Sequence, residues 1–211
     1  MGNKTEKQPE FELTGGDICL DLANTLSDRP RCRTDRLPDY TALLQWCEQA
    51  GVLDPAEVKA LAREAERRPE QARAAFRRVI EFRECVYRLF ARLAADQAPA
   101  DADLDELNRG LTRALPRLQV RRRSTGLEWQ WSAGPRDLDR MLWPVMHAAA
   151  QLLTQEPKLR VGECDSATCS WLFVDRSRGR RRRWCEMKSC GNRAKARRHY
   201  ARKKTGKRVA R

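Results

Sequence analysis

Apolar residues recur every three or four positions through most of the first 155 residues, which predicts a mainly helical body. The longest of these segments begins at Pro69, and its wide apolar stripe from Phe76 to Leu93 predicts the central core helix. The other predicted helices of this part follow aspartates that can serve as N-caps, namely Asp17, Asp39, Asp54 and Asp101.

The period of the pattern changes between Leu118 and Trp131, where apolar and polar residues alternate on both sides of a Ser-Thr-Gly turn. This alternation predicts a β-hairpin. A helical period then returns from Pro135 to Glu156, and Pro144 is expected to kink that helix. The predicted fold is mainly α with a small β-hairpin, of the α+β class, with a helical N-terminal domain and a small C-terminal module that holds four cysteines.

Positive charge is concentrated in the last quarter of the chain. Residues 158–211 hold 19 Lys and Arg against 4 acidic residues, whereas the preceding 157 residues carry a net charge of −1. We therefore predict two domains, a mostly helical body over 1–157 and a basic module over 158–211. A nearly neutral body with a cationic module favours a polyanion as the partner of that module.

No apolar run approaches the roughly 18 residues that a membrane-spanning helix needs. The first residues also lack the apolar segment of a secretory signal, so we expect a cytoplasmic protein with no membrane partner. Thiols stay reduced in that compartment unless a metal holds them. Four cysteines have no ligand-like spacing and are expected to be packed in the core, namely Cys19, Cys32, Cys47 and Cys85.

The other four cysteines form two pairs with a short segment between them. Cys164 and Cys169 are followed after 15 residues by Cys185 and Cys190, with four residues inside each pair. Two close pairs of thiols are typical of a structural Zn²⁺ site, whereas the spacing matches neither ferredoxin pattern. Zinc would supply folding free energy on the order of 10 kcal/mol, which a short basic segment cannot obtain from its few apolar residues.

Arginines and lysines surround these cysteines on a loop and on a predicted helix after Cys190. Such a surface is suited to phosphates, and arginine can also read guanine edges in DNA. RNA stays open, because nearby aromatic side chains could stack on bases. The candidate nucleic-acid contacts are Arg180, Arg181, Arg182, Arg183, Arg193, Lys195, Arg197, Arg198 and Arg202.

The usual catalytic motifs are missing from the sequence, which has two histidines and no glycine-rich phosphate loop, so we do not expect an enzyme. A closed site in which cysteines supply all four ligands also leaves no open position for a catalytic water. Polar Asn24 stands inside the apolar run "LDLANTL". Either it caps a helix or makes a buried hydrogen bond, or it lines a ligand pocket together with Trp46 and Arg83.

The C-terminal residues resemble the CGNR zinc finger family. Both cysteine pairs match, as do the element Phe173-x-Asp175-x-Ser177, the sequence Arg-Trp-Cys at 183–185 and the sequence Cys-Gly-Asn-Arg at 190–193. The segments "GGDICLDLANTL" and "LLQWCEQAGVL" resemble the start of the ABATE domain, which usually precedes this finger and is described as a stress-induced transcription regulator.

This resemblance implies zinc held by the finger, DNA as its partner, and a body that senses a ligand or mediates assembly. Three other classes stay open: an RNA-binding or ribosome-associated protein, a small-molecule enzyme with an accessory zinc module, and a zinc module that only docks on its own body. A homodimer on paired DNA half-sites also fits the small size of the finger.

Overall fold

The computed structural model of the chain describes residues 11–29, 31, 34–124, 126–134, 136–155, 160–179 and 181–209. Within this part the fold is mainly α with small antiparallel sheets, which confirms the predicted class. None of the helices described combines the length and the hydropathy that crossing a bilayer requires.

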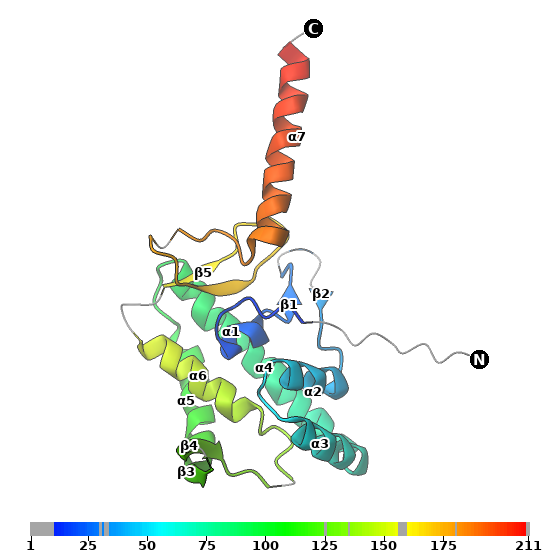
Figure 1. Ribbon diagram of the computed structural model, residues 1–211, viewed down its shortest axis with the longest axis vertical. Coiled ribbons are helices and arrows are strands. Elements are labelled where there is room, and N and C mark those ends of the chain that lie inside the picture. Colours follow the sequence, from blue (N-terminus) through cyan, green and yellow to red (C-terminus); the bar gives the residue numbers. More distant parts are fainter. Residues whose placement is uncertain are drawn as a thin grey trace, which may run out of the picture.

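The elements follow in the order helices, hairpin, helix and basic module (Figure 1). The helices of the body are α1 (Ile18–Ala23), α2 (Tyr40–Gln49), α3 (Pro55–Arg67), α4 (Pro69–Ala94), α5 (Asp101–Ala114) and α6 (Leu142–Thr154), with a 3₁₀ turn η1 (Leu115–Arg117). Three two-stranded antiparallel sheets pair β1 (Leu26–Ser27) with β2 (Thr34–Asp35), β3 (Leu118–Arg123) with β4 (Gly126–Trp131), and β5 (Arg160–Glu163) with β6 (Leu172–Asp175). The chain continues through a π-helical turn η2 (Met187–Gly191) into α7 (Asn192–Val209).

Three of the four predicted aspartate N-caps are confirmed. The Asp17 carboxylate accepts from the Cys19 amide, and that of Asp39 accepts from the Ala42 amide. Asp54 forms a reciprocal capping box with Glu57, with Pro55 as the first helical residue. The fourth prediction is wrong, because α5 begins at Asp101 itself and no side chain caps it.

The helix α6 begins later than the apolar period predicts. Its first residue is Leu142, and residues 136–141 form turns instead. Pro144 therefore lies in the first turn, where the backbone N–H that proline lacks would have no helical partner. The predicted kink is wrong for this reason.

Helix α4 runs through the body and packs against α1, α2, α3 and α5 (Figure 1). Its buried side chains include Phe82, Val86, Leu89 and Phe90, as its apolar stripe predicts. The predicted burial of the scattered cysteines is confirmed for Cys19, Cys47 and Cys85, and Cys32 lies outside the described residues.

The core of the body continues into the C-terminal module. Val161 of β5 and Leu172 and Val174 of β6 belong to the same buried cluster as the side chains of α1 and α4. The Val174 amide also donates to the Gly15 carbonyl at 2.8 Å. The domain boundary at 157/158 stays a prediction, but the sheet that follows it is packed into the body.

Candidate metal centre and basic surface

Four cysteine sulfurs meet where the β5–β6 sheet faces the start of α7. Cys164 directly follows β5, Cys169 lies in the turn before β6, and Cys190 lies in η2. The sulfurs of these three and Cys185 all lie within 4.8 Å of one another. The structure thus brings together both predicted pairs, although the second pair is contributed by a segment that follows a long loop.

The distances fit a tetrahedral thiolate site. The Cys169 and Cys185 sulfurs are 3.8 Å apart, and those of Cys185 and Cys190 are 3.6 Å apart. Four sulfurs about 2.3 Å from one Zn²⁺ would be separated by about 3.8 Å, whereas a disulfide needs about 2.05 Å. The four cysteines are free thiols, so the donor set suits a soft divalent metal.

The charges in the cluster also call for a cation. Hydrogen bonds from Cys169 and Cys185 lower the pKa of Cys164, whereas the hydrogen bond with Cys164 raises the pKa of Cys169. Ionisation of Cys164 is therefore favoured by its hydrogen bonds at the expense of its neighbours, and four thiolates so close together would also repel one another. A bound cation would remove this conflict, since metal ligands must be deprotonated.

Two neighbours of Cys190 support the cluster. Arg193 donates a hydrogen bond through Nη2 to the Cys190 sulfur at 3.0 Å, and this bond raises the pKa of Arg193. Gly191 turns the chain into α7 so closely that an added Cβ would lie 2.4 Å from the Met187 sulfur. The sequence analysis assigned Arg193 to nucleic acid and missed this contact, although its position one helical turn after Cys190 was a signal.

The arginines of the loop before Cys185 differ in their surroundings. Arg181 is exposed, and Arg183 pairs with Asp165 at 2.6 Å. Arg182 instead stacks on the Phe173 ring at 4.3 Å and donates to the carbonyls of Val174, Thr14 and Trp184. Its guanidinium joins the loop to the body, so its predicted role as a nucleic-acid contact is not supported. Arg180 lies outside the described residues.

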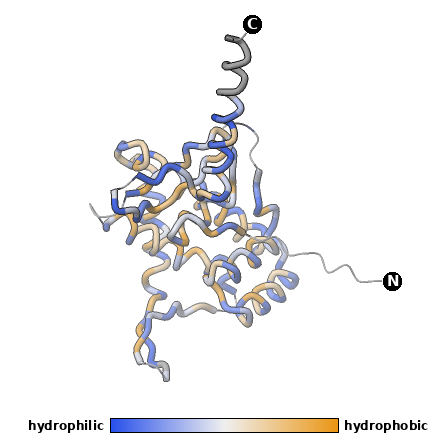
Figure 2. Tube along the Cα trace, turned by 45° about the horizontal axis from the view of Figure 1, so that its top comes forward, coloured by the Kyte–Doolittle hydropathy of each residue, from blue (hydrophilic) through white to orange (hydrophobic). Residues whose placement is uncertain are grey.

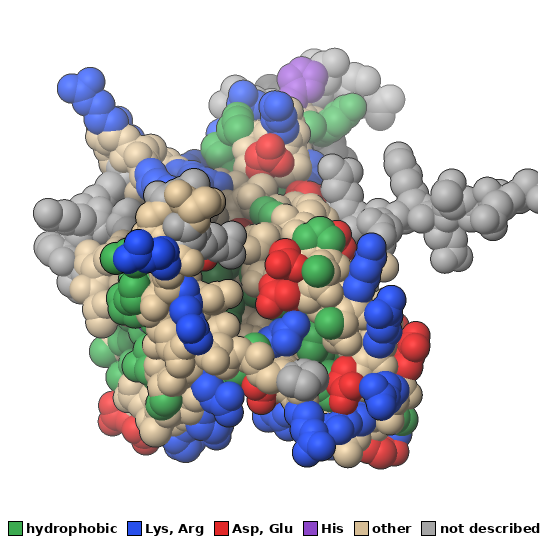
Figure 3. Space-filling model, turned by 60° about the horizontal axis from the view of Figure 1, so that its bottom comes forward, with side chains coloured by type: hydrophobic (Ala, Val, Ile, Leu, Met, Phe, Trp, Pro, Cys, Tyr) green, Lys and Arg blue, Asp and Glu red, His purple; other side chains and the backbone are tan. Residues whose placement is uncertain are grey.

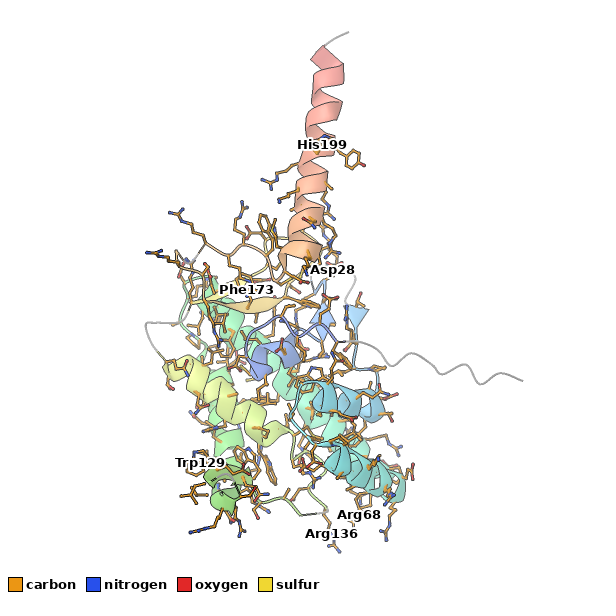
Figure 4. All side chains as sticks on the ribbon, in the orientation of Figure 1. Asp28, Arg68, Trp129, Arg136, Phe173 and His199 are labelled. Carbon is orange, nitrogen blue, oxygen red and sulfur yellow. The ribbon has the colours of Figure 1, made fainter. Side chains whose placement is uncertain are left out.

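Helix α7 presents cations to solvent. The side chains of Lys195, Arg197 and Arg198 are exposed, as are those of His199 and Tyr200. The helix has no acidic residue and projects away from the body, with His199 well clear of it (Figure 4). Arg202 lies further along the same helix, where the side chains are outside the described residues.

A cavity of about 530 Å³ lies beside the sulfur cluster, between the first turn of α7 and the β1–β2 segment. Arg36, Lys188 and Glu12 line it, and Arg36 pairs with Glu12 at 3.3 Å. The Arg36 guanidinium lies 5.5 Å from the centre of the Trp171 ring. The sequence analysis did not single out Arg36, because it lies far from the cysteines along the chain.

The three residues predicted to bind a ligand all have internal contacts. Asn24 is 2 % exposed, and its amide donates to the Leu172 carbonyl at 2.9 Å while accepting from the Leu172 amide at 2.8 Å. Arg83 is also buried and pairs with both carboxylate oxygens of Asp35. Trp46 is buried in the core. These contacts are structural and give no support to a ligand pocket formed by the three residues.

Comparison with known families agrees with this architecture. A family model described as "Putative stress-induced transcription regulator", named ABATE, matches residues 16–156. The chain belongs to the ABATE family. A second model, the CGNR zinc finger, matches residues 160–203 of this ABATE protein and includes all four clustered cysteines. A search of curated proteins finds no match.

Both predicted resemblances are therefore confirmed. The match of the finger model covers the sulfur cluster and the described, exposed part of α7. In this ABATE protein the cysteine cluster is a metal-binding site, and the cationic helix begins within two residues of its last ligand candidate, Cys190.

Proposed function

We propose that this ABATE protein is a zinc-dependent, DNA-binding transcription regulator. The observation that carries the proposal is the position of α7, which starts beside Cys190 and extends an acid-free basic surface into solvent. A metal in the cluster would fix the direction in which this helix leaves the body. The described side chains that would meet phosphates are Arg181, Lys195, Arg197 and Arg198.

Zinc is the metal that the four sulfurs favour. Zn²⁺ has no redox chemistry, takes four thiolates readily, and would serve here to hold the fold together. Its ligands are proposed to be Cys164, Cys169, Cys185 and Cys190. Arg193 would then stabilise the charge of the Cys190 thiolate through the hydrogen bond that it already makes.

We also propose that the protein is not an enzyme. Burial raises the pKa of each of the three described cysteines in the body, to about 12 for Cys85, so these thiols would stay protonated at neutral pH. The body is instead proposed to sense a ligand or to mediate assembly. Asn24 and Arg83 are already bonded inside the protein, so they are not available to bind a ligand. This favours assembly as the role of the body.

The DNA-binding proposal is tested with a variant that carries Lys195→Gln, Arg197→Gln and Arg198→Gln. Because each phosphate contact contributes a slope of about −0.9 in a plot of log affinity against log salt, we expect the slope to become shallower by about 3. The measurement is fluorescence anisotropy of labelled duplex DNA at several salt concentrations. The matched control carries Lys59→Gln, Arg63→Gln and Arg67→Gln, which neutralises three exposed cations of α3.

An equal loss in both variants would contradict the proposal, since binding would then depend only on net charge. An unchanged affinity in the α7 variant would contradict it as well. The same titration is repeated with duplex RNA and with single-stranded RNA. Tighter binding to either form than to duplex DNA would overturn DNA as the partner.

A further inference from the structure

The β3–β4 hairpin exposes an apolar face. Its register places Val120 opposite Trp129 and Arg122 opposite Leu127, so these four side chains share one face of the sheet. Leu127 is 73 % exposed, Trp129 68 % and Val120 52 %. A two-stranded hairpin by itself is only marginally stable in water, so such a face needs a covering partner to be stable.

The base of the hairpin is anchored to α6 by aromatic contacts. Trp131 packs against Trp143 and His147 of α6, with ring centres 6.3 and 5.9 Å apart. Beyond this contact the hairpin projects from the body as an arm, at the lower left of Figure 2. The exposed Val120, Leu127 and Trp129 all belong to this arm.

A cleft of about 560 Å³ lies between the hairpin and the turn that joins α2 to α3. Figure 3 shows the hollow between the two lobes at this end of the molecule. Val52, Leu53 and Pro144 contribute apolar walls, and carboxylates of Asp54 and Glu57 lie at its side. Glu128 also lines the cleft and lies opposite Arg121 in the hairpin register, and Arg140 lies 3.8 Å from Glu57.

This end of the molecule is therefore self-complementary. The arm carries apolar side chains and the exposed Arg122, and the neighbouring cleft has apolar walls with the carboxylates of Asp54 and Glu57 at its side. A two-fold dimer requires that one surface contain both halves of each contact, because residue i of one copy meets residue j of the other in both directions. A hairpin with strands of six residues extends about 20 Å, which is enough to reach along a second copy.

We propose that two copies of this chain pair through their β3–β4 hairpins. Val120, Leu127 and Trp129 of each copy pack on the hairpin of the other, and Arg122 faces the acidic side of the opposite cleft. This surface lies at the end of the molecule opposite α7, as the positions of Trp129 and His199 show in Figure 4. The pairing is therefore independent of the proposed contact with DNA.

The test is the oligomeric state of the full, metal-loaded chain, measured by sedimentation velocity over a range of concentrations. We expect a reversible dimer, and we expect Leu127→Ser with Trp129→Ser to raise its dissociation constant at least tenfold. The matched control is Tyr200→Ser, which removes a 71 % exposed aromatic side chain at the other end and should leave the dimer unchanged. Circular dichroism of the variants checks that the fold is retained, as the high exposure of these residues predicts.

Charge is tested separately with Arg122→Glu. This change places a carboxylate against the acidic cleft and should weaken the dimer most at low salt, because salt screens the repulsion. A monomer at every concentration would overturn the proposal, as would a hairpin variant that dimerises like the unmodified chain. Loss of nucleic-acid affinity in the hairpin variant without a change in oligomeric state would overturn it too, and would assign the arm to nucleic acid.

Discussion

At the scale of single residues, buried polar side chains connect the body to the zinc-finger segment. The side-chain amide of Asn24 forms hydrogen bonds with both the N–H and the C=O of Leu172, 148 residues away. It thus bonds to β6 as a neighbouring strand would. Arg182 makes the reverse connection, from the finger loop to the Thr14 carbonyl. Each side chain satisfies groups that would otherwise be buried without partners, which is costly in a protein interior.

Replacing Asn24 by Ala should destabilise the protein by about 3 kcal/mol. Both hydrogen bonds to Leu172 would be lost, and its buried N–H and C=O would have no partner. Urea denaturation of the full chain measures this change. Asn108→Ala is the control, because Asn108 is exposed on α5, and a similar loss there would show that the contact with Leu172 is not the cause.

At the scale of elements, the finger segment divides into two parts with different supports. The β5–β6 sheet shares the core of the body through Val161, Leu172 and Val174. Cys164, Trp171, Phe173, Cys185 and Cys190 form a second, small cluster. Few apolar side chains support that second cluster, so the metal would be its main source of stability.

Removing the metal with a chelator should therefore unfold only part of the finger. We expect faster hydrogen exchange over residues 181–195 and little change at Leu172 and Val174, because these two side chains remain packed in the core of the body. Mass spectrometry of exchanged peptides measures this, after metal analysis has established one zinc per chain. Cys185→Ser should reproduce the pattern, and Cys47→Ser, a change in the core away from the cluster, should not. An equal increase in hydrogen exchange over the whole chain would contradict the division of the finger segment into two parts.

At the scale of the whole molecule, the two exposed surfaces lie at opposite ends of one continuous core. Helix α7 leaves the body at one end, and the β3–β4 hairpin leaves it at the other (Figure 1). Among the described residues, β5 and β6 belong to the same core as α1 and α4. The stability of the body is therefore expected to depend on β5 and β6, and the direction of α7 on the metal.

A chain that ends at residue 157 should be unstable. It would lose β5 and β6 and expose the apolar side chains of α1 and α4 that these strands cover. We expect it to bind a hydrophobic dye and to melt without a sharp transition, whereas a chain ending at Ala196 should melt like the full protein. Thermal denaturation by circular dichroism compares the two. Cooperative melting of the shorter chain at the original temperature would instead establish 1–157 as an independent domain.

The sequence by itself determined the features that depend on near neighbours. The helices after Asp17, Asp39 and Asp54 and the hairpin from Leu118 to Trp131 follow from local caps, periods and turns, which act over a few residues. The cysteine spacing predicted the sulfur cluster, because the two members of each pair are only five positions apart. The start of α6 was missed, since an apolar period does not mark where a helix begins.

Only the tertiary structure decided the roles of Asn24, Arg182 and Arg83. Each of these polar groups meets a partner far along the chain, and no local pattern encodes which distant group a folded core will bring near. The exposure of Trp129 also depends on the tertiary structure. The alternation of apolar and polar residues in β4 shows which side chains share a face, but not whether another element covers that face. Local interactions fix the elements, whereas burial depends on how the elements pack.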